Sequence, residues 1–295
     1  MRFSLVRRYA SWAFMVLAVA FLIVAVVRQW PAFSAAASRV DGWSIAGAAV
    51  AGLLALGCAL FAWRNAIAAT SKKIPLGDAA HTYFVSQLGK YVPGAVWPVV
   101  AQMELMRKYG VARANSALGS ILAMVVGLGS AVLVGTVGIF LAGGSIASYW
   151  WLLPIAAGCA AALVPPLLRW ALQLAARIHT RFTVFADVPI KGSYLLQVAG
   201  WSALGWLFWG IHAWFILGAL VPSTPRLFWF AIGSFAVAWA VGFVIIIAPG
   251  GIGPRELALT GLLSTVATPS DALALVIITR LLMTLLDVAV AAGAA

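Results

Sequence analysis

The segment Gly250-Gly251-Ile252-Gly253-Pro254-Arg255-Glu256 combines residue types that suit the binding of an anion. Glycines allow the positive φ angles of a sharp chain reversal, and proline fits the first position of a helix because its missing N–H costs nothing there. A helix that begins at Pro254 would present free backbone N–H groups and the positive end of its dipole. With the guanidinium of Arg255 beside them, these groups predict a phosphate site. The alternative is a plain helix cap in which Arg255 and Glu256 neutralise each other.

A second group that could bind an anion, Arg280, lies near the middle of the apolar run 271–292. A charged residue at the centre of a membrane helix costs roughly 2.5–3.5 kcal/mol on insertion scales. Met283 and Asp287 follow at i+3 and i+7, on the same helical face. We expect Arg280 to face an internal polar cavity with Asp287 or Glu256 as its counter-ion. A purely structural ion pair is the alternative.

A weak internal repeat relates two broken segments, residues 86–111 and 249–266. Each has a Pro-Gly pair, a second proline four or five residues later, and an apolar helical pattern that carries a Glu. Short discontinuous segments in both halves of a chain are typical of transporter binding sites. Neither apolar part is long enough to span a bilayer, so we expect two re-entrant helices around an internal cavity. The candidate residues of the first segment are Lys90, Tyr91, Pro93, Gly94, Glu104 and Arg107.

The composition places these segments in a membrane. Of the 295 residues, 64% are hydrophobic and 9% are charged, against about half and about a quarter in ordinary globular domains. A soluble fold could not bury so much apolar surface, so we expect an all-α polytopic membrane protein with a single integral domain over residues 1–295. The chain has no nucleic-acid motif, no metal-ligand spacing among its three histidines and no phosphate loop for ATP. We therefore expect no nucleic-acid partner, no metal and no cofactor.

Seven apolar stretches are long enough to cross a bilayer, which takes roughly 20 residues: 12–27, 43–63, 117–141, 150–168, 194–220, 227–248 and 271–292. The first could also be a signal peptide, but its apolar core exceeds the roughly 7–15 residues typical of one. Fifteen of the 19 Lys and Arg residues fall in the N-terminal segment and the connections on its side. The positive-inside rule therefore predicts a cytoplasmic N-terminus, and seven spans would place the C-terminus outside.

Two motifs resemble those of a known family. "IAPGGIGPREL", followed further along by Arg280-Leu281, is similar to the second-half signature of the bacterial lysylphosphatidylglycerol synthase/flippase transmembrane family. "GKYVPGAVWPVVAQMELMRKYGV" resembles the corresponding first-half segment, and the resemblance covers roughly residues 10–292. In the commoner first-half pattern Gly-Glu and an Arg follow Pro-Gly. Here Trp97-Pro98 occupies that region, and Glu104 and Arg107 come later.

The resemblance implies lipid translocation. It does not extend to the soluble aminoacyl-transfer domain of the synthase, so lysyl transfer is not carried over. We expect a flippase for an anionic phospholipid or a polyprenyl-phosphate-linked sugar in a bacterial cytoplasmic (inner) membrane. The anionic headgroup would lie among the re-entrant helix starts, Arg255 and Arg280. Glu256, Glu104 and Asp287 would balance charge or accept a coupling proton.

Two other classes of function remain open. A membrane-embedded glycosyl- or phosphotransferase for lipid-linked substrates would need a carboxylate pair or an Asp-rich metal site, and the seven acids are scattered. A non-catalytic scaffold for a glycosyltransferase would tolerate substitution of Arg255 and Arg280. The expected partners are therefore membrane lipids, with a glycosyltransferase or a second copy of the chain as further candidates.

Overall fold

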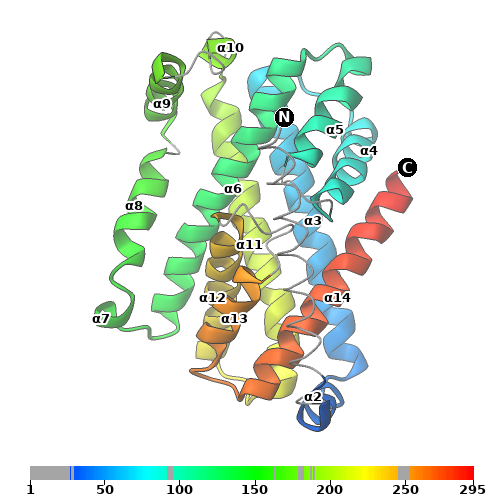
Figure 1. Cartoon of the computed structure of the whole chain (residues 1–295), viewed down its shortest axis with the longest axis vertical. Coiled ribbons are helices and arrows are strands. Elements are labelled where there is room, and N and C mark those ends of the chain that lie inside the picture. The colour runs from blue at the N-terminus through cyan, green and yellow to red at the C-terminus, as the bar shows by residue number, and fades with distance from the viewer. Residues whose placement is uncertain are drawn as a thin grey trace, which may run out of the picture.

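The computed structural model is all-helical over the residues that it describes, which are 27, 30–91, 96–162, 164–178, 183–186, 188, 190–244 and 253–295. The helices are α2 (Trp30–Ala37), α3 (Gly42–Thr70), α4 (Leu76–Gln87), η1 (Leu88–Tyr91), α5 (Trp97–Leu105), η2 (Met106–Tyr109), α6 (Arg113–Leu141), α7 (Ile146–Tyr149), α8 (Leu152–Ala162), α9 (Pro165–Ile178), α10 (Thr183–Ala186), α11 (Gly192–Leu220), α12 (Pro225–Val244), α13 (Pro254–Leu263) and α14 (Pro269–Ala294). Among these residues, five helices (α3, α6, α11, α12 and α14) are long and apolar enough to cross a membrane. They form the bundle in Figure 1, as expected of a polytopic membrane protein.

These five helices correspond to five of the seven predicted spans. The predicted span 12–27 lies almost wholly outside the described residues. The predicted span 150–168 is divided, because α8 ends at Ala162 and α9 begins at Pro165. A proline inside a helix removes a backbone hydrogen bond and clashes with the preceding turn, which accounts for the division. With 11 residues, α8 is shorter than the roughly 20 residues that cross a bilayer.

Side chains at two helix starts satisfy N–H groups that have no partner within the helix. Asp41 precedes α3, and its Oδ1 accepts a 2.8 Å hydrogen bond from the Ser44 N–H. The hydrogen bond to Ser44 holds the pKa of Asp41 below its usual value. Thr268 precedes α14, and its hydroxyl accepts a 3.3 Å hydrogen bond from the Asp271 N–H. The sequence therefore sets where both helices begin.

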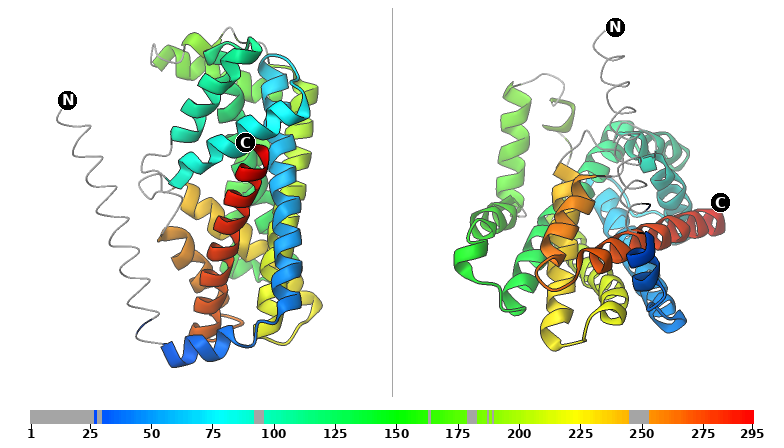
Figure 2. Two further views of the ribbon diagram at one scale, coloured as in Figure 1. Left: turned by 90° about the vertical axis from the view of Figure 1, so that its right-hand side faces the viewer. Right: turned by 60° about the horizontal axis from the view of Figure 1, so that its bottom comes forward.

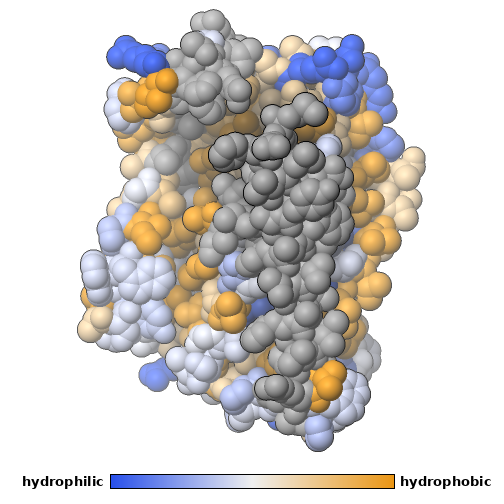
Figure 3. All heavy atoms as spheres, in the orientation of Figure 1, coloured by the Kyte–Doolittle hydropathy of each residue, from blue (hydrophilic) through white to orange (hydrophobic). Residues whose placement is uncertain are grey.

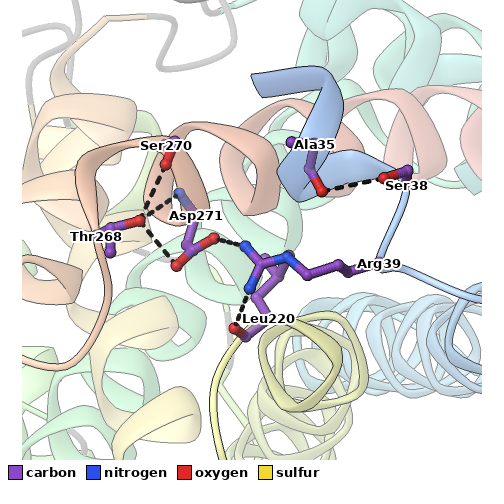
Figure 4. A network of polar contacts seen from close by, with 7 residues as sticks. All are labelled: Ala35, Ser38, Arg39, Leu220, Thr268, Ser270 and Asp271. Carbon is purple, nitrogen blue, oxygen red and sulfur yellow. Dashed lines mark hydrogen bonds and ion pairs between the residues drawn. The ribbon is translucent and has the colours of Figure 1, made fainter. Parts of the chain in front are cut away.

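The start of α14 is also tied to two other elements (Figure 4). Arg39, in the connection between α2 and α3, pairs with Asp271. The same guanidinium donates a 2.9 Å hydrogen bond from Nη1 to the carbonyl oxygen of Leu220 at the end of α11. Asp271 is buried and also accepts a 2.8 Å hydrogen bond from the Thr268 hydroxyl. These contacts fix the ends of three long helices together.

The two halves of the chain run in opposite senses (Figures 1 and 2). In the first half, α3 rises from the end of the bundle that carries α2 to the far end. There α4 runs inward and α5 returns, and α6 then descends. In the second half, α11 descends from the far end, where α9 lies, to the α2 end. There α12 runs inward and α13 returns, and α14 then rises. We refer to these two ends as the α2 end and the α9 end. Inverted repeats of this kind occur in many transporters, and the arrangement agrees with the weak repeat in the sequence.

The C-terminus lies at the α9 end, on the same side as the basic connections 64–113 and 169–193, whereas seven spans would place it on the opposite side from them. The Ala294 carbonyl oxygen lies 2.9 Å from Nδ1 of His81, so the end of α14 reaches α4. The expectation of seven spans counted 227–248 as a full crossing. It therefore placed the segment 249–266 on the same side as the other basic connections. In the structure, α12 begins and α13 ends at the α2 end (Figure 1).

Basic side chains gather at the α9 end. Those in its helix ends and connections are Lys72, Lys73, Arg107, Lys108, Arg113, Arg169, Arg177 and Lys191. Of the described Lys and Arg residues, Arg39 and Arg226 lie at the α2 end. Figure 3 shows strongly hydrophilic residues at the α9 end and hydrophobic ones below them, on the left and right sides of the same face. This asymmetry is the pattern expected when one end faces the cytoplasm.

Glycines bring α12 against α6. A Cβ on Gly138 would lie 2.8 Å from the backbone nitrogen of Gly233, and one on Gly233 would lie 2.6 Å from the backbone nitrogen of Ile139. Only residues without side chains permit two helix backbones to approach this closely. The contact fixes α12, which carries two of the residues around Arg255.

A buried hydrogen-bond network fixes the hairpin of α4 and α5. Gln102 of α5 accepts at Oε1 from Trp63 Nε1 at 3.1 Å and from the Ser120 hydroxyl at 2.6 Å. Its Nε2 donates to the Ser86 hydroxyl at 3.0 Å. The network therefore joins α5 to α3, α6 and α4. Because buried polar groups are stable only when hydrogen-bonded, it also constrains the position of η1, which directly follows α4.

Candidate functional site

The start of α13 has the geometry that its sequence predicts. Gly253 precedes the helix with a φ of 98°, in the region that favours glycine, and Pro254 occupies the first helical position. Oε2 of Glu256 accepts a 2.6 Å hydrogen bond from the Gly253 N–H. Gly250 and Gly251 lie outside the described residues. The carboxylate thus satisfies an N–H group that the helix start would otherwise leave free.

Glu256 is the counter-ion of Arg280. Its Oε1 pairs with the guanidinium of Arg280, on α14. Of the two carboxylates expected as possible partners, the structure therefore selects Glu256. Both oxygens of this side chain are engaged, one by the start of its own helix and one by α14.

Arg255 has no carboxylate partner among the described residues. The side chain directly before Glu256 in the chain is thus unpaired with it, and Arg255 is only 5% exposed. Its guanidinium lies 4.7 Å from the centre of the Phe235 ring, and its Nη2 lies 3.2 Å from Sδ of Met283. An aromatic face and a thioether attract a cation only weakly. The self-neutralising Arg255–Glu256 pair is not formed, because Glu256 pairs with Arg280 instead.

Asp287 joins α14 to the first half of the chain. Its Oδ2 lies 2.6 Å from Nζ of Lys90 and accepts a 2.6 Å hydrogen bond from the Tyr91 hydroxyl. Asp287 is 4% exposed, whereas the Lys90 side chain is 32% exposed. Lys90 and Tyr91 end the hairpin arm formed by α4 and η1, as Arg255 and Glu256 begin the arm formed by α13. The two hairpins therefore meet at the middle of α14.

We call these five charged residues the charged cluster: Lys90, Arg255, Glu256, Arg280 and Asp287. Electrostatic interactions connect Lys90 and Arg255 with the ion pairs around them, so the five act as one group. The cluster contains three cations and two carboxylates, and each carboxylate already pairs with one cation. One positive charge, that of Arg255, is left without an acidic partner. A buried cation in this position is costly unless an anion completes its surroundings.

Glu104 and Arg107 lie apart from the charged cluster. Glu104 pairs with Arg107 at 3.4 Å and with Arg113 at 2.7 Å, and all three side chains are at least half exposed. They occupy the α9 end, where α5 finishes and α6 begins. Pro93 and Gly94 lie outside the described residues. From the first broken segment, the structure thus brings Lys90 and Tyr91 to the site and leaves Glu104 and Arg107 outside it.

Two residues of α12 around Arg255 were not predicted from the sequence. Phe235 supplies the aromatic face, and a Cβ on Gly242 would lie 2.7 Å from Cβ of Arg255. They are seven positions apart and so share one helical face. In an apolar helix rich in Phe, Trp and Gly, neither residue carries a signal that separates it from ordinary packing. Among the described residues, no group of three or more His, Cys, Asp or Glu side chains could hold a metal.

A family model for the lysylphosphatidylglycerol synthase transmembrane region matches residues 12–291. The chain belongs to this family. No curated protein matches the sequence. The match agrees with the resemblance seen in the two motifs. Together, the match and the apolar helices show that the chain is a multi-pass membrane protein of this family.

Proposed function

We propose that this protein is a flippase that carries an anionic lipid across the bacterial cytoplasmic membrane. The observation that supports the proposal best is Arg255, a buried cation without a carboxylate partner among the described residues. Family membership agrees with a role in lipid handling. The phosphate of the headgroup would lie against Arg255 at the start of α13, while the acyl or prenyl chains stay in the bilayer.

The charged cluster would lower the barrier to crossing by replacing the water around the phosphate. A charge that enters a medium of low dielectric constant without partners meets a barrier of many kcal/mol. Guanidinium groups offer several N–H donors in a fixed plane and suit phosphate oxygens. The positive end of the α13 dipole adds to this attraction. The two carboxylates keep the empty site from carrying three uncompensated charges.

The inverted halves suit transport between the two membrane surfaces. One hairpin, α4 with α5, opens at the α9 end, and the other, α12 with α13, opens at the α2 end. Rocking of two such halves around a fixed site is the usual basis of alternating access. We propose that both hairpins re-enter the membrane and that the basic α9 end faces the cytoplasm.

Transport assays with an Arg255→Met variant test this function. The purified chain is reconstituted in vesicles, and the appearance of labelled anionic lipid in the opposite leaflet is measured. We expect the rate to fall about ten- to a hundredfold, because a hydrogen bond to a charged group contributes about 1.5–3 kcal/mol. Arg226→Met, at the exposed start of α12, is the matched control and should transport normally. Equal rates for a folded Arg255→Met variant and the unchanged protein would contradict the proposal.

A further inference from the structure

We infer that the charged cluster selects a lipid phosphodiester with a single negative charge, and that the Lys90–Asp287 pair sets this preference. The inference rests on the proposed function and specifies its substrate class. Lipid phosphodiesters include glycerophospholipids and sugars linked to a polyprenyl chain through one phosphate. Phosphomonoesters and diphosphates carry a larger charge and would be bound less well.

The charge balance of the cluster leads to this inference. Arg280 is neutralised by Glu256, and Lys90 is neutralised by Asp287. The remaining charge of +1 resides on Arg255, which is held between Phe235 and Met283. A ligand with one negative charge makes the occupied site neutral. A ligand with two would leave an excess negative charge inside the protein, where an uncompensated charge is costly.

The two ion pairs cannot readily rearrange to accept a second negative charge. Glu256 is held on both sides, by the Gly253 N–H and by Arg280. Asp287 is held by the Lys90 ammonium and by the Tyr91 hydroxyl. If Lys90 or Arg280 moved to a second negative charge on the ligand, Asp287 or Glu256 would lose its counter-ion in a largely buried position. The cluster is therefore built for a fixed ligand charge.

Substitution of Asp287 and Lys90 permits the charge of the site to be raised and then returned to its original value. Asp287→Asn removes one negative charge and brings the empty site to +2, while the amide oxygen can still accept from the Tyr91 hydroxyl. Lys90→Met combined with Asp287→Asn removes both members of the pair and returns the site to +1. If Lys90 and Asp287 had only a structural role, removing both would not restore the ligand preference that Asp287→Asn alone changes.

The experiment is a lipid competition measured by native mass spectrometry on the purified full-length chain. The probes are phosphatidylmethanol, phosphatidic acid and diacylglycerol with identical acyl chains, mixed in equal amounts at about pH 8.5, where a phosphomonoester carries close to two charges. The protein should retain phosphatidylmethanol about tenfold or more over each of the other two. Asp287→Asn should shift the preference to phosphatidic acid, and the double variant should restore it.

The outcomes separate this inference from the proposed function. Tighter binding of phosphatidic acid by the unchanged protein, or an unchanged preference in a folded Asp287→Asn variant, overturns the charge rule and leaves an anionic-lipid site intact. Failure of both anionic lipids to outcompete diacylglycerol overturns the proposed function as well. A second competition, between phosphatidylmethanol and a polyprenyl phosphoglucose, distinguishes the two sources of a phosphodiester. Retention of either one supports the inference.

Discussion

Tyr91 and Asp287 are 196 residues apart in the chain, and the Tyr91 hydroxyl donates a 2.6 Å hydrogen bond to Oδ2 of Asp287. Lys90 pairs with the same carboxylate oxygen. These contacts join the inner end of the first hairpin to the middle of the last helix. A single buried carboxylate therefore connects the two inverted halves beside the guanidinium groups of the second half.

Substitution of Tyr91 tests this connection. In Tyr91→Phe, Asp287 loses one of its donors but keeps Lys90, so we expect a loss of about 0.5–1.5 kcal/mol in stability. The measurement is the midpoint of thermal unfolding in detergent. Tyr194→Phe is the matched control, because no partner of the Tyr194 hydroxyl is found in the described part of the chain. Equal midpoints for the two variants would show that the Tyr91 hydrogen bond contributes nothing.

The Arg280–Glu256 pair should show strong coupling in a double-mutant cycle. Breaking a fully buried pair costs about 3–5 kcal/mol, and these side chains are 24% and 15% exposed, so Arg280→Met and Glu256→Gln should each cost somewhat less. The double variant should lose clearly less than the sum of the two, because neither charge is left alone. Thermal unfolding of the four proteins gives the coupling. Full transport by a folded Arg280→Met variant would remove Arg280 from the proposed site.

The close approach of α6 and α12 should not tolerate an added methyl group. Gly138→Ala places a Cβ 2.8 Å from the Gly233 backbone nitrogen, so the helices must separate, at an expected cost of about 1–3 kcal/mol. Gly127→Ala lies on the same helix with open space around the new Cβ. This control should be neutral or stabilising, since alanine favours helix by up to about 1 kcal/mol over glycine. The check is the thermal unfolding midpoint, and a Gly138→Ala variant as stable as the control would contradict the packing.

Cysteine labelling in intact cells should place the two ends of the bundle on opposite sides of the membrane. In a background with Cys58→Ala and Cys159→Ala, Thr265→Cys lies at the α2 end and Lys108→Cys at the α9 end, both at exposed positions. A membrane-impermeant maleimide should label the first directly and the second only after permeabilisation. Labelling of both cysteines from outside would contradict a crossing between the two ends. Labelling of Lys108→Cys alone would reverse the proposed orientation.

Much of the fold could be predicted from local sequence. Apolar runs of sufficient length mark α3, α6, α11, α12 and α14 because each membrane helix satisfies its own backbone hydrogen bonds and must face lipid or other apolar helices. The break at Gly253-Pro254 follows from the conformational limits of two residues. The side on which the C-terminus lies could not be predicted in this way, because it depends on the direction in which α13 leaves the inner end of its hairpin.

The sequence alone predicts that Arg255 and Arg280 lie inside an apolar protein and need anionic partners, since a charge within a membrane helix is costly wherever it points. The way in which the carboxylates are shared follows from the folded arrangement of the helices. Glu256 turns to Arg280 and not to its neighbour Arg255, and Asp287 turns to Lys90 from the other half of the chain. Pairing between distant helices depends on how they pack, and packing is a property of the whole bundle. For that reason the unmatched charge on Arg255 emerges only from the assembled structure.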